Sequence, residues 1–240
     1  MRRFFAEKLD IESGSVRLTG DEARHIGCVL RMKTGDEVLL INGEGAQSKA
    51  RITELTGEYV ELEIIEKSVC LADPEVRVTL FQCLPKQGKM EVIIQKCVEL
   101  GVWSIVPTVS KRCIVKLDSK DNKLARWNKV SAEASKQCGR AYVPEVTSPV
   151  TLSKAPLGEY DLVLIAYENE DGNSLKAALR AHSGAERIAL IIGPEGGFEP
   201  DEVEACVGMG AVPVSLGKRI LRTETAGMAA LAQIMYELDQ

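Results

Sequence analysis

The sequence predicts an α/β protein in two parts, a small N-terminal β-barrel or sandwich followed by a larger α/β domain. Alternating strands separated by turn signals fill the first seventy or so residues, whereas apolar strands alternate with helices after that. The segment LADPE, around Pro74, interrupts both patterns and predicts the boundary. With 240 residues, 45% of them hydrophobic, the chain can bury a core in each part.

The N-terminal part is expected to hold four strands and one helix. The strand segments, which alternate between apolar and polar residues, are SVRLTG (15–20), DEVLLING (36–43), QSKARITEL (47–55) and YVELEIIEKS (59–68). Asn42-Gly43 is a hairpin signal, and Thr56-Gly57 marks another turn. DEARHIGCVLR (21–31) has apolar residues at helical spacing, so we expect one helix there.

The second part is expected to be a mostly parallel sheet with helices on both faces, because its strands are almost continuously apolar and each is followed by a helical pattern. The strand segments are VRVTLFQCL (76–84), WSIVPTV (103–109), DLVLIAY (161–167), RIALIIG (187–193) and AVPVSLG (211–217). The helical segments are KMEVIIQKCVEL (89–100), NKLARWNKVSAEASKQ (122–137), NSLKAALRAH (173–182), a helix opened by Pro200, and TAGMAALAQIMYEL (225–238). Gly101 is suited to end the first of these helices.

Charge is distributed unevenly along the chain. The net charge is −5, yet residues 86–140 hold twelve basic and five acidic residues, a balance of +7. A basic block in an acidic protein suits an anionic partner met on one face. The alternative is that these cations are only the solvated side of helices.

Composition narrows the class of protein further. The seven cysteines form no CxxC pair and most stand in apolar patterns, which is typical of reduced core thiols and favours neither a metal site nor a disulfide framework. The opening MRRFFAEKLD is basic without an apolar segment behind it, and no later stretch has the length of a membrane span. We therefore expect a cytoplasmic protein without a metal or a membrane anchor.

Three loops that follow apolar strands carry the unusual residues: IAYENEDG (165–172), IIGPEGGF (191–198) and VSLGKRILRTET (214–225). The carboxyl ends of parallel strands meet at one edge of a sheet, which is where ligands bind in such folds. A phosphate cradle is disfavoured because the chain has no GK[ST] ending and no GxGxxG after a strand, and because Glu195 would repel an anion. A cationic or neutral ligand fits better, and a plain tight turn is the structural alternative.

Together with LPKQGKMEVIIQKCVELGV (84–102) and EASKQCGR (133–140), these loops resemble the SPOUT methyltransferase superfamily, and within it the ribosomal RNA small subunit methyltransferase E family. The similarity extends over nearly the whole chain, including MRRFF and HIGCVLRMKTGDEV. It implies a PUA-like RNA-binding β-barrel at residues 1–72 and a SPOUT methyltransferase α/β domain with a trefoil knot at residues 73–240. The implied activity is transfer of a methyl group from S-adenosylmethionine to the N3 atom of a uridine in 16S rRNA of the small ribosomal subunit, by a homodimer.

The resemblance also implies site residues. The donor-binding residues carried over by position are Glu168, Gly193, Glu195, Gly196, Gly197, Leu216, Gly217, Ile220, Leu221 and Ala226. Loss of the uridine N3 proton leaves an anion that a cation would stabilise, and Arg222 is the first candidate and Arg140 the second, unless they form salt bridges with loop carboxylates. Glu224 could act as the base or simply favour the start of a helix, and both histidines have structural explanations. The expected RNA-binding residues are Arg2, Arg3, Arg24, Arg31, Lys86, Lys89 and Lys96.

Two questions stay open at this level. Glu195 either lies near the sulfonium of the donor or caps its own loop, and we favour the cap slightly. The chain could also be a non-catalytic dimeric RNA-binding module with a degenerate methyltransferase fold, although intact GPEGG and LRTETA loops count against that reading. A phosphotransfer enzyme is disfavoured by the missing P-loop lysine and dinucleotide fingerprint.

Overall fold

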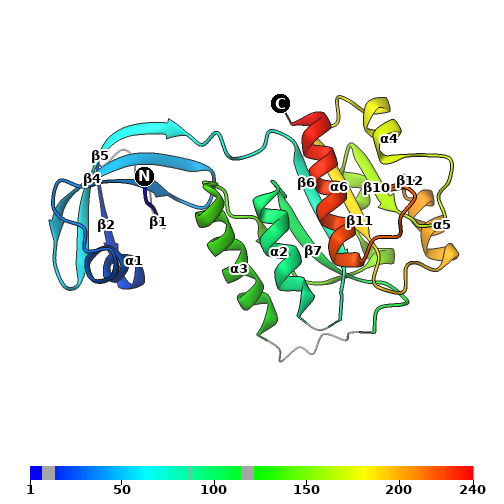
Figure 1. The fold of residues 1–240 in the computed structure, drawn as a ribbon, viewed down its shortest axis with the longest axis horizontal. Helices are drawn as coiled ribbons and strands as arrows, with labels where there is room; N and C mark the ends of the chain where they lie inside the picture. The colour runs from blue at the N-terminus through cyan, green and yellow to red at the C-terminus, as the bar shows by residue number, and fades with distance from the viewer. Residues whose placement is uncertain (7–13, 87, 115–121, 240) are drawn as a thin grey trace. The chain divides into compact units, whose positions relative to one another are not determined.

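The computed structural model describes residues 1–6, 14–86, 88–114 and 122–239. The chain forms two compact units. The first unit comprises Met1–Asp73 and Ser135–Val143, and the second comprises Pro74–Ala134 and Pro144–Gln240 (Figure 1). The mixed α/β class is confirmed.

The first unit is built on a five-stranded sheet with the order β1-β3-β4-β5-β2. Its strands are β1 (Arg3–Phe5), β2 (Ser15–Thr19), β3 (Glu37–Ile41), β4 (Ala46–Leu55) and β5 (Tyr59–Val69). The Asn42-Gly43 hairpin joins β3 to β4 as predicted, and the Asn42 side chain accepts the N–H groups of Glu44 and Ala46, both at 2.9 Å. The turn at Thr56 joins β4 to β5, and its hydroxyl accepts the Tyr59 N–H at 3.0 Å.

The predicted helix of the first unit is present, but it changes type along its length. Helix α1 (Gly20–Arg24) continues as a π-helical turn, η1 (His25–Val29), and Arg31 follows with a φ of 52°. Arg31 is the one non-glycine residue with a positive φ in the described part of the chain. Helix α1 and η1 bury Ala23 and Ile26 in the core that the inward residues of the strands provide.

The second unit contains a parallel sheet in the order β12-β10-β11-β6-β7-β8, with β9 also paired to β7. Its strands are β6 (Arg77–Cys83), β7 (Ser104–Val109), β8 (Glu145–Val146), β9 (Val150–Thr151), β10 (Leu162–Ala166), β11 (Arg187–Ile192) and β12 (Ala211–Val214). Its helices are α2 (Lys89–Glu99), α3 (Lys123–Cys138), η2 (Leu152–Lys154), η3 (Leu157–Glu159), α4 (Leu175–Ala181), α5 (Pro200–Gly208) and α6 (Thr223–Leu238). The last residues of α3 group with the first unit.

Alternate residues of the central strands point to opposite faces of this sheet. Phe81 and Cys83 of β6 join a core cluster with Val203 and Cys206 of α5. On the other face, α6 packs on β6 and β11 and against α2 and α4 (Figure 1). No helix in the described part of the chain has both the length and the apolar character needed to cross a membrane.

The connections place a topological switch at β6. The chain leaves β6 for β7 on one side, whereas β11, from much later in the sequence, pairs with β6 on the other. Ligands bind outside the carboxyl ends of the strands at such a point. The loops after β6, β10, β11 and β12 therefore define the region to examine.

The short strands β1, β8 and β9 were not predicted. Each has two or three residues, too few to show an alternating pattern, and each is defined by its partner strand: β1 pairs with β3, and β8 and β9 pair with β7. A long-range pairing of this kind leaves no local signal in the sequence.

Candidate active site

The loop after β11, residues 193–197, is here called the first loop. Its turn is closed by the Gly197 N–H, which donates to the Pro194 carbonyl at 3.0 Å. Gly197 has a φ of 68°, and a Cβ at this position would overlap the Glu168 carboxylate. Glycine is therefore required at 197 both for its conformation and for the close approach of Glu168, the residue that follows β10 by two positions.

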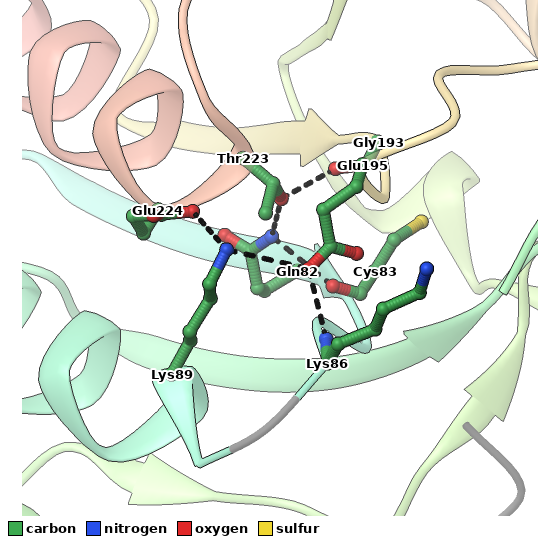
Figure 2. Close-up of polar contacts among 8 residues, drawn as sticks. All are labelled: Gln82, Cys83, Lys86, Lys89, Gly193, Glu195, Thr223 and Glu224. Carbon is green, nitrogen blue, oxygen red and sulfur yellow. Dashed lines mark hydrogen bonds and ion pairs between the residues drawn. The ribbon is translucent and has the colours of Figure 1, made fainter. Parts of the chain in front are cut away.

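Glu195 projects from the middle of the first loop toward the segment that follows β6. Its carboxylate accepts the backbone N–H of Lys86 at 3.0 Å and lies 3.5 Å from Nζ of Lys89 (Figure 2). Partial burial pushes the pKa of the Glu195 carboxyl upward, but the Lys86 N–H, its own N–H and the Lys89 ammonium leave that pKa below its ordinary value. The carboxylate is thus an ionised internal cap.

Lys89 connects the first loop to the start of α6. Its ammonium lies 3.2 Å from Oε2 of Glu224 as well as 3.5 Å from Glu195 (Figure 2). The backbone N–H of Glu224 itself and the Lys89 ammonium hold the pKa of the Glu224 carboxyl below its usual range. All three side chains are half-buried, so this is a partly shielded ion cluster that joins the first loop to helices α2 and α6.

The segment 215–222 between β12 and α6 is here called the second loop. The residue that follows it, Thr223, is the first residue of α6 and contacts the first loop. Its buried hydroxyl donates to the Gly193 carbonyl at 2.6 Å and accepts from Nε2 of Gln82 at 2.9 Å (Figure 2). Gly193 itself lies against the buried Phe198 ring, 3.0 Å from where a Cβ would stand. A hydrogen bond therefore joins the first loop to the start of α6, directly after the second loop.

The remaining predicted donor-binding residues lie on the second loop and α6. Leu216 and Leu221 are half-buried, Gly217 is exposed, and Ile220 has 89% of its surface exposed. Ala226 is buried in the first turn of α6. These residues give the second loop apolar side chains that the protein itself covers incompletely.

Arg112 was not predicted as a site residue, yet it holds the outer side of the first loop. Its guanidinium donates to the Gly196 carbonyl at 2.6 Å and to Oε1 of Glu199 at 2.8 Å. Glu199 and Glu202 form the capping box of α5, and the Lys111 N–H also donates to Glu202 at 2.7 Å. The sequence signal was the basic block itself, which supplies cations to acidic residues near the first loop.

The two predicted catalytic arginines lie in different units. Arg222 is exposed at the N-cap of α6, and its carbonyl accepts the N–H groups of Thr225 and Ala226 at 2.8 Å. Arg140 lies in the first unit with 2% of its surface exposed, and its Nε is 3.0 Å from the Asp73 carboxylate. The salt-bridge alternative weighed for these arginines describes Arg140 well, although its partner is Asp73 and not a loop carboxylate.

The expected RNA-binding residues divide in the same way between the two units. In the first unit Arg2, Arg24 and Arg31 are exposed, whereas Arg3 is half-buried with its guanidinium against Gly139. In the second unit, three lysines were predicted, Lys86, Lys89 and Lys96. Lys86 is exposed, Lys89 belongs to the ion cluster, and Lys96 pairs with Glu99 at 2.9 Å.

Several cations of the basic block are paired with carboxylates inside their own unit. Lys111 pairs with Asp201, Arg112 with Glu199 and Arg126 with Glu91. The block is therefore less basic as a surface than its composition indicates. Among the described residues, no group of three or more His, Cys, Asp or Glu side chains is arranged to hold a metal ion.

The chain was compared with protein-family models and curated sequences. Residues 72–235 match the RNA methyltransferase domain, and residues 18–65 match the RNA methyltransferase PUA domain. Ribosomal RNA small subunit methyltransferase E of Bacillus subtilis is 32% identical over 250 residues, which cover 100% of this chain and 98% of the relative. The protein of that name from Synechocystis is 35% identical, with 95% of this chain and 75% of the relative covered.

Solved structures give the same result at the level of the fold. A ribosomal RNA small subunit methyltransferase E from Neisseria gonorrhoeae, bound to S-adenosylmethionine, matches with a TM-score of 0.87 and 33% identity, and the match covers 99% of this chain and 98% of that one. A Legionella pneumophila protein in complex with the same cofactor matches with a TM-score of 0.80 and 33% identity, covering 94% and 93%.

Proposed function

The chain belongs to the ribosomal RNA small subunit methyltransferase E family, and from this membership we propose that it methylates N3 of a uridine in 16S rRNA. It is an S-adenosylmethionine-dependent rRNA methyltransferase. The observation that carries the proposal is the 2.6 Å hydrogen bond between the Thr223 hydroxyl and the Gly193 carbonyl. This bond ties the first loop to the start of α6, directly after the second loop, at the switch point of the sheet, where we expect one donor to contact both loops.

The residues of the two loops fit the methyl donor. The Gly193 and Gly196 carbonyls and the Gly197 N–H hold the first loop in shape. The donor is therefore expected to contact the other main-chain groups of these glycines, which no side chain covers. Leu216, Gly217, Ile220, Leu221 and Ala226 supply the apolar wall that an adenosyl group needs. Glu168 completes the pocket beside Gly197, and Glu195 serves it indirectly by holding the first loop in shape.

When bound, the donor supplies an electrophilic methyl carbon attached to a sulfonium, and the protein must align a nucleophile with it. Uridine N3 becomes that nucleophile once its proton is lost, which leaves negative charge on the base. Arg222 stabilises this charge, because it is exposed at the N-cap of α6 beside Thr223. Glu224 is a poor base, since its pKa is lowered and Lys89 pairs with it, so its part is to hold Lys89.

We assign Arg140 a supporting part. Its buried guanidinium is engaged by Asp73, and the same carboxylate accepts the N–H groups of Ala141 and Tyr142 at 3.1 and 3.0 Å. Such an arrangement orders residues 139–142 and leaves little opportunity for contact with a substrate. Arg222 remains the catalytic arginine of this proposal.

RNA binding is the proposed task of residues 1–72, and methyl transfer that of residues 73–240. Arg2, Arg24 and Arg31 are the exposed cations for phosphate contacts in the first part, with Arg3 behind them and Lys86 and Lys96 in the second. The π-helical turn before Arg31 and the positive φ of Arg31 support a functional role, because such irregular backbone concentrates at binding sites. Because several cations of the basic block are paired with carboxylates, we expect the assembled small subunit, and not free RNA, to be the substrate.

Three further features follow from the family and are part of the proposal: a trefoil knot in the second domain, a homodimer and a cytoplasmic location. Small ribosomal subunits are the partner, and the protein meets them where they assemble.

The direct test supplies the protein with labelled S-adenosylmethionine and small ribosomal subunits from cells that lack the modification. The expected product is 3-methyluridine at one position of 16S rRNA, with less product from free 16S rRNA. A protein that bound RNA but neither bound the donor nor transferred the label would be the non-catalytic dimeric module considered above.

A further inference from the structure

Gln82 is a polar residue in the buried central sheet of the second unit, where an apolar residue would be expected. It lies near the carboxyl end of β6, between Ile192 of β11 and Pro107 of β7, and none of its surface is exposed. It shares a face of the sheet with Leu80, and both lie against Gly227 of α6. An amide in this position needs hydrogen-bond partners, because burying it without them costs free energy.

The hydrogen bonds of Gln82 have a fixed direction. Nε2 donates to the Cys83 carbonyl at 3.1 Å and to Oγ1 of Thr223 at 2.9 Å (Figure 2). The Thr223 hydroxyl has one proton, and it is donated to the Gly193 carbonyl at 2.6 Å. Thr223 can therefore only accept from Gln82, and the amide cannot be turned around without breaking this chain.

The other end of the amide is less satisfied. Oε1 is buried and has no hydrogen-bond partner in the described part of the chain. It lies 3.1 Å from the place where a Cβ of Gly227 would stand, so alanine there would force it to move. Helix α6 thus has a glycine in its interior, where alanine is the better helix former, at the point where Gln82 needs space.

Stability alone does not account for these features. A buried acceptor without a partner and a glycine inside a helix both lower the free energy of unfolding. An apolar side chain at position 82 would leave no unsatisfied acceptor and no amide for which Gly227 must leave space. A buried polar atom without a partner calls for an explanation, and a functional role is one of the explanations known in native proteins. What offsets this loss of stability is the fixed geometry of Thr223 and Gly193, which the hydrogen bond from the Gln82 Nε2 imposes.

We propose that Gln82 is a positioning residue for methyl transfer, which fixes the first loop and the start of α6 relative to each other through the Thr223 hydroxyl. The inference rests on the proposed function, because it assumes that the donor binds between these loops. Gln82 does not touch the donor. It orients Thr223, which holds the Gly193 carbonyl on one side and stands next to Arg222 on the other.

The test uses the full-length protein with Gln82→Leu, which keeps a side chain of similar volume and removes the amide N–H that donates to Thr223. The matched control is Thr79→Val, which removes another buried polar group from the same strand, β6. The Thr79 hydroxyl lies 2.9 Å from the Ser104 hydroxyl, away from the carboxyl ends of the strands. Donor affinity is measured by calorimetry, kcat and KM by methyl transfer to small subunits, and stability by thermal unfolding.

We expect Gln82→Leu to weaken donor binding about tenfold and to lower kcat as well, as the loss of one buried hydrogen-bond donor predicts. The control should match the wild type in both quantities. Thr223→Val should lower donor affinity and kcat to the same extent as Gln82→Leu. The double variant should bind the donor no more weakly than the single variant with the lower affinity, because both residues act through one hydrogen bond. Should Gln82→Leu not fold, Gln82→Met and Thr223→Val carry the same test.

A second cycle tests the link to α6. Gly227→Ala should weaken donor binding in the otherwise wild-type protein, because its Cβ displaces the Gln82 amide, and should have a smaller effect in a protein that also carries Gln82→Ala. Equal donor affinity and kcat in Gln82→Leu and Thr79→Val would overturn the inference, provided that the wild type transfers methyl groups. A wild type without transfer would instead refute the proposed function.

Discussion

The first and second loops follow neighbouring regions of the same sheet edge, yet they are held very differently. The first loop is fixed from three sides, by Thr223 at its start, by the Lys86 N–H on Glu195, and by Arg112 on the Gly196 carbonyl. The second loop is exposed from Gly217 to Ile220, and 89% of the Ile220 surface is uncovered. One wall of the proposed pocket is formed in advance, whereas the other awaits a ligand or a second subunit.

This difference indicates a division of roles. A pre-formed wall lowers the entropy that binding must remove, so the first loop should determine how tightly the donor binds. An exposed apolar wall gains its contacts only when a ligand or another subunit covers it. The second loop should therefore become buried on binding but contribute less to donor affinity than the first loop. Changes in the first loop should therefore affect donor affinity more strongly than changes in the second.

The largest effect is expected at Gly197. Gly197→Val places a β-branched residue at a φ of 68° and displaces the Glu168 carboxylate. We expect donor affinity in calorimetry to fall at least about thirtyfold, which corresponds to about 2 kcal/mol. Gly197→Ala should show the same change to a smaller degree.

Gly210→Val is the matched control for this change. Gly210 has a φ of 92° and no atom within 4 Å of the added Cβ, so it shares the backbone strain without a neighbour in the pocket. Its unfolding temperature should fall while donor affinity stays at the wild-type value. Unchanged donor affinity in Gly197→Val would show that the first loop is not a wall of the pocket.

A smaller loss of affinity is expected when the outer support of the first loop is removed. Arg112→Met deletes the hydrogen bonds to the Gly196 carbonyl and to Glu199. Only the bond to Gly196 holds the first loop, so the donor Kd should rise about tenfold, as expected for the loss of that one charge-assisted hydrogen bond. Lys111→Met is the control, because it loses an exposed ion pair with Asp201 in the same segment. If both variants bind the donor alike, Arg112 has no special part in the pocket.

The second loop should give a still weaker effect. Ile220→Ser should raise the donor Kd about threefold, since an exposed side chain gains only part of its burial when a ligand covers it. Its unfolding temperature should equal that of the wild type, because Ile220 is exposed in the unliganded protein. Val207→Ser on α5, also an exposed apolar residue, is the control; a tenfold or larger loss in Ile220→Ser would reverse the proposed ranking of the two loops.

The smallest effect concerns pH. The pKa values of Glu195 and Glu224 lie below the ordinary 4.5, so the stabilisation they contribute is present above that pH and is lost as the pH falls through the lowered values. The wild type should therefore be more stable than Lys89→Met at neutral pH, and the difference should shrink at about pH 3. Urea unfolding of both proteins at the two pH values measures this, and a constant difference would exclude the ion cluster as its source.

Much of the fold was visible in the sequence because its signals are local. Alternation, continuous apolar runs and turn residues identified the major strands and helices, and Asn42 and Thr56 marked turns through their own side-chain hydrogen bonds. The short strands β1, β8 and β9 escaped because their pairing partners decide them. The loops of the site were found by their glycines and by the family resemblance.

The supports of the site were harder to predict. Gln82 is a polar residue in the largely apolar strand VRVTLFQCL, but its side-chain partner Thr223 is more than a hundred positions away, and Thr223 in turn bonds to Gly193. Arg112 was read as part of a basic block, and its pairing with Glu199 depends on how α5 packs. Side chains that act across the fold carry no local pattern, so the sequence indicated where the loops are and not what holds them.

The most direct measurement is a crystal structure of this protein soaked with S-adenosylmethionine. The account predicts electron density for the donor between residues 193–197 and 216–222, with its methyl group directed toward the Arg222 side of the pocket. Density at any other position, with both loops unchanged and empty, would contradict it.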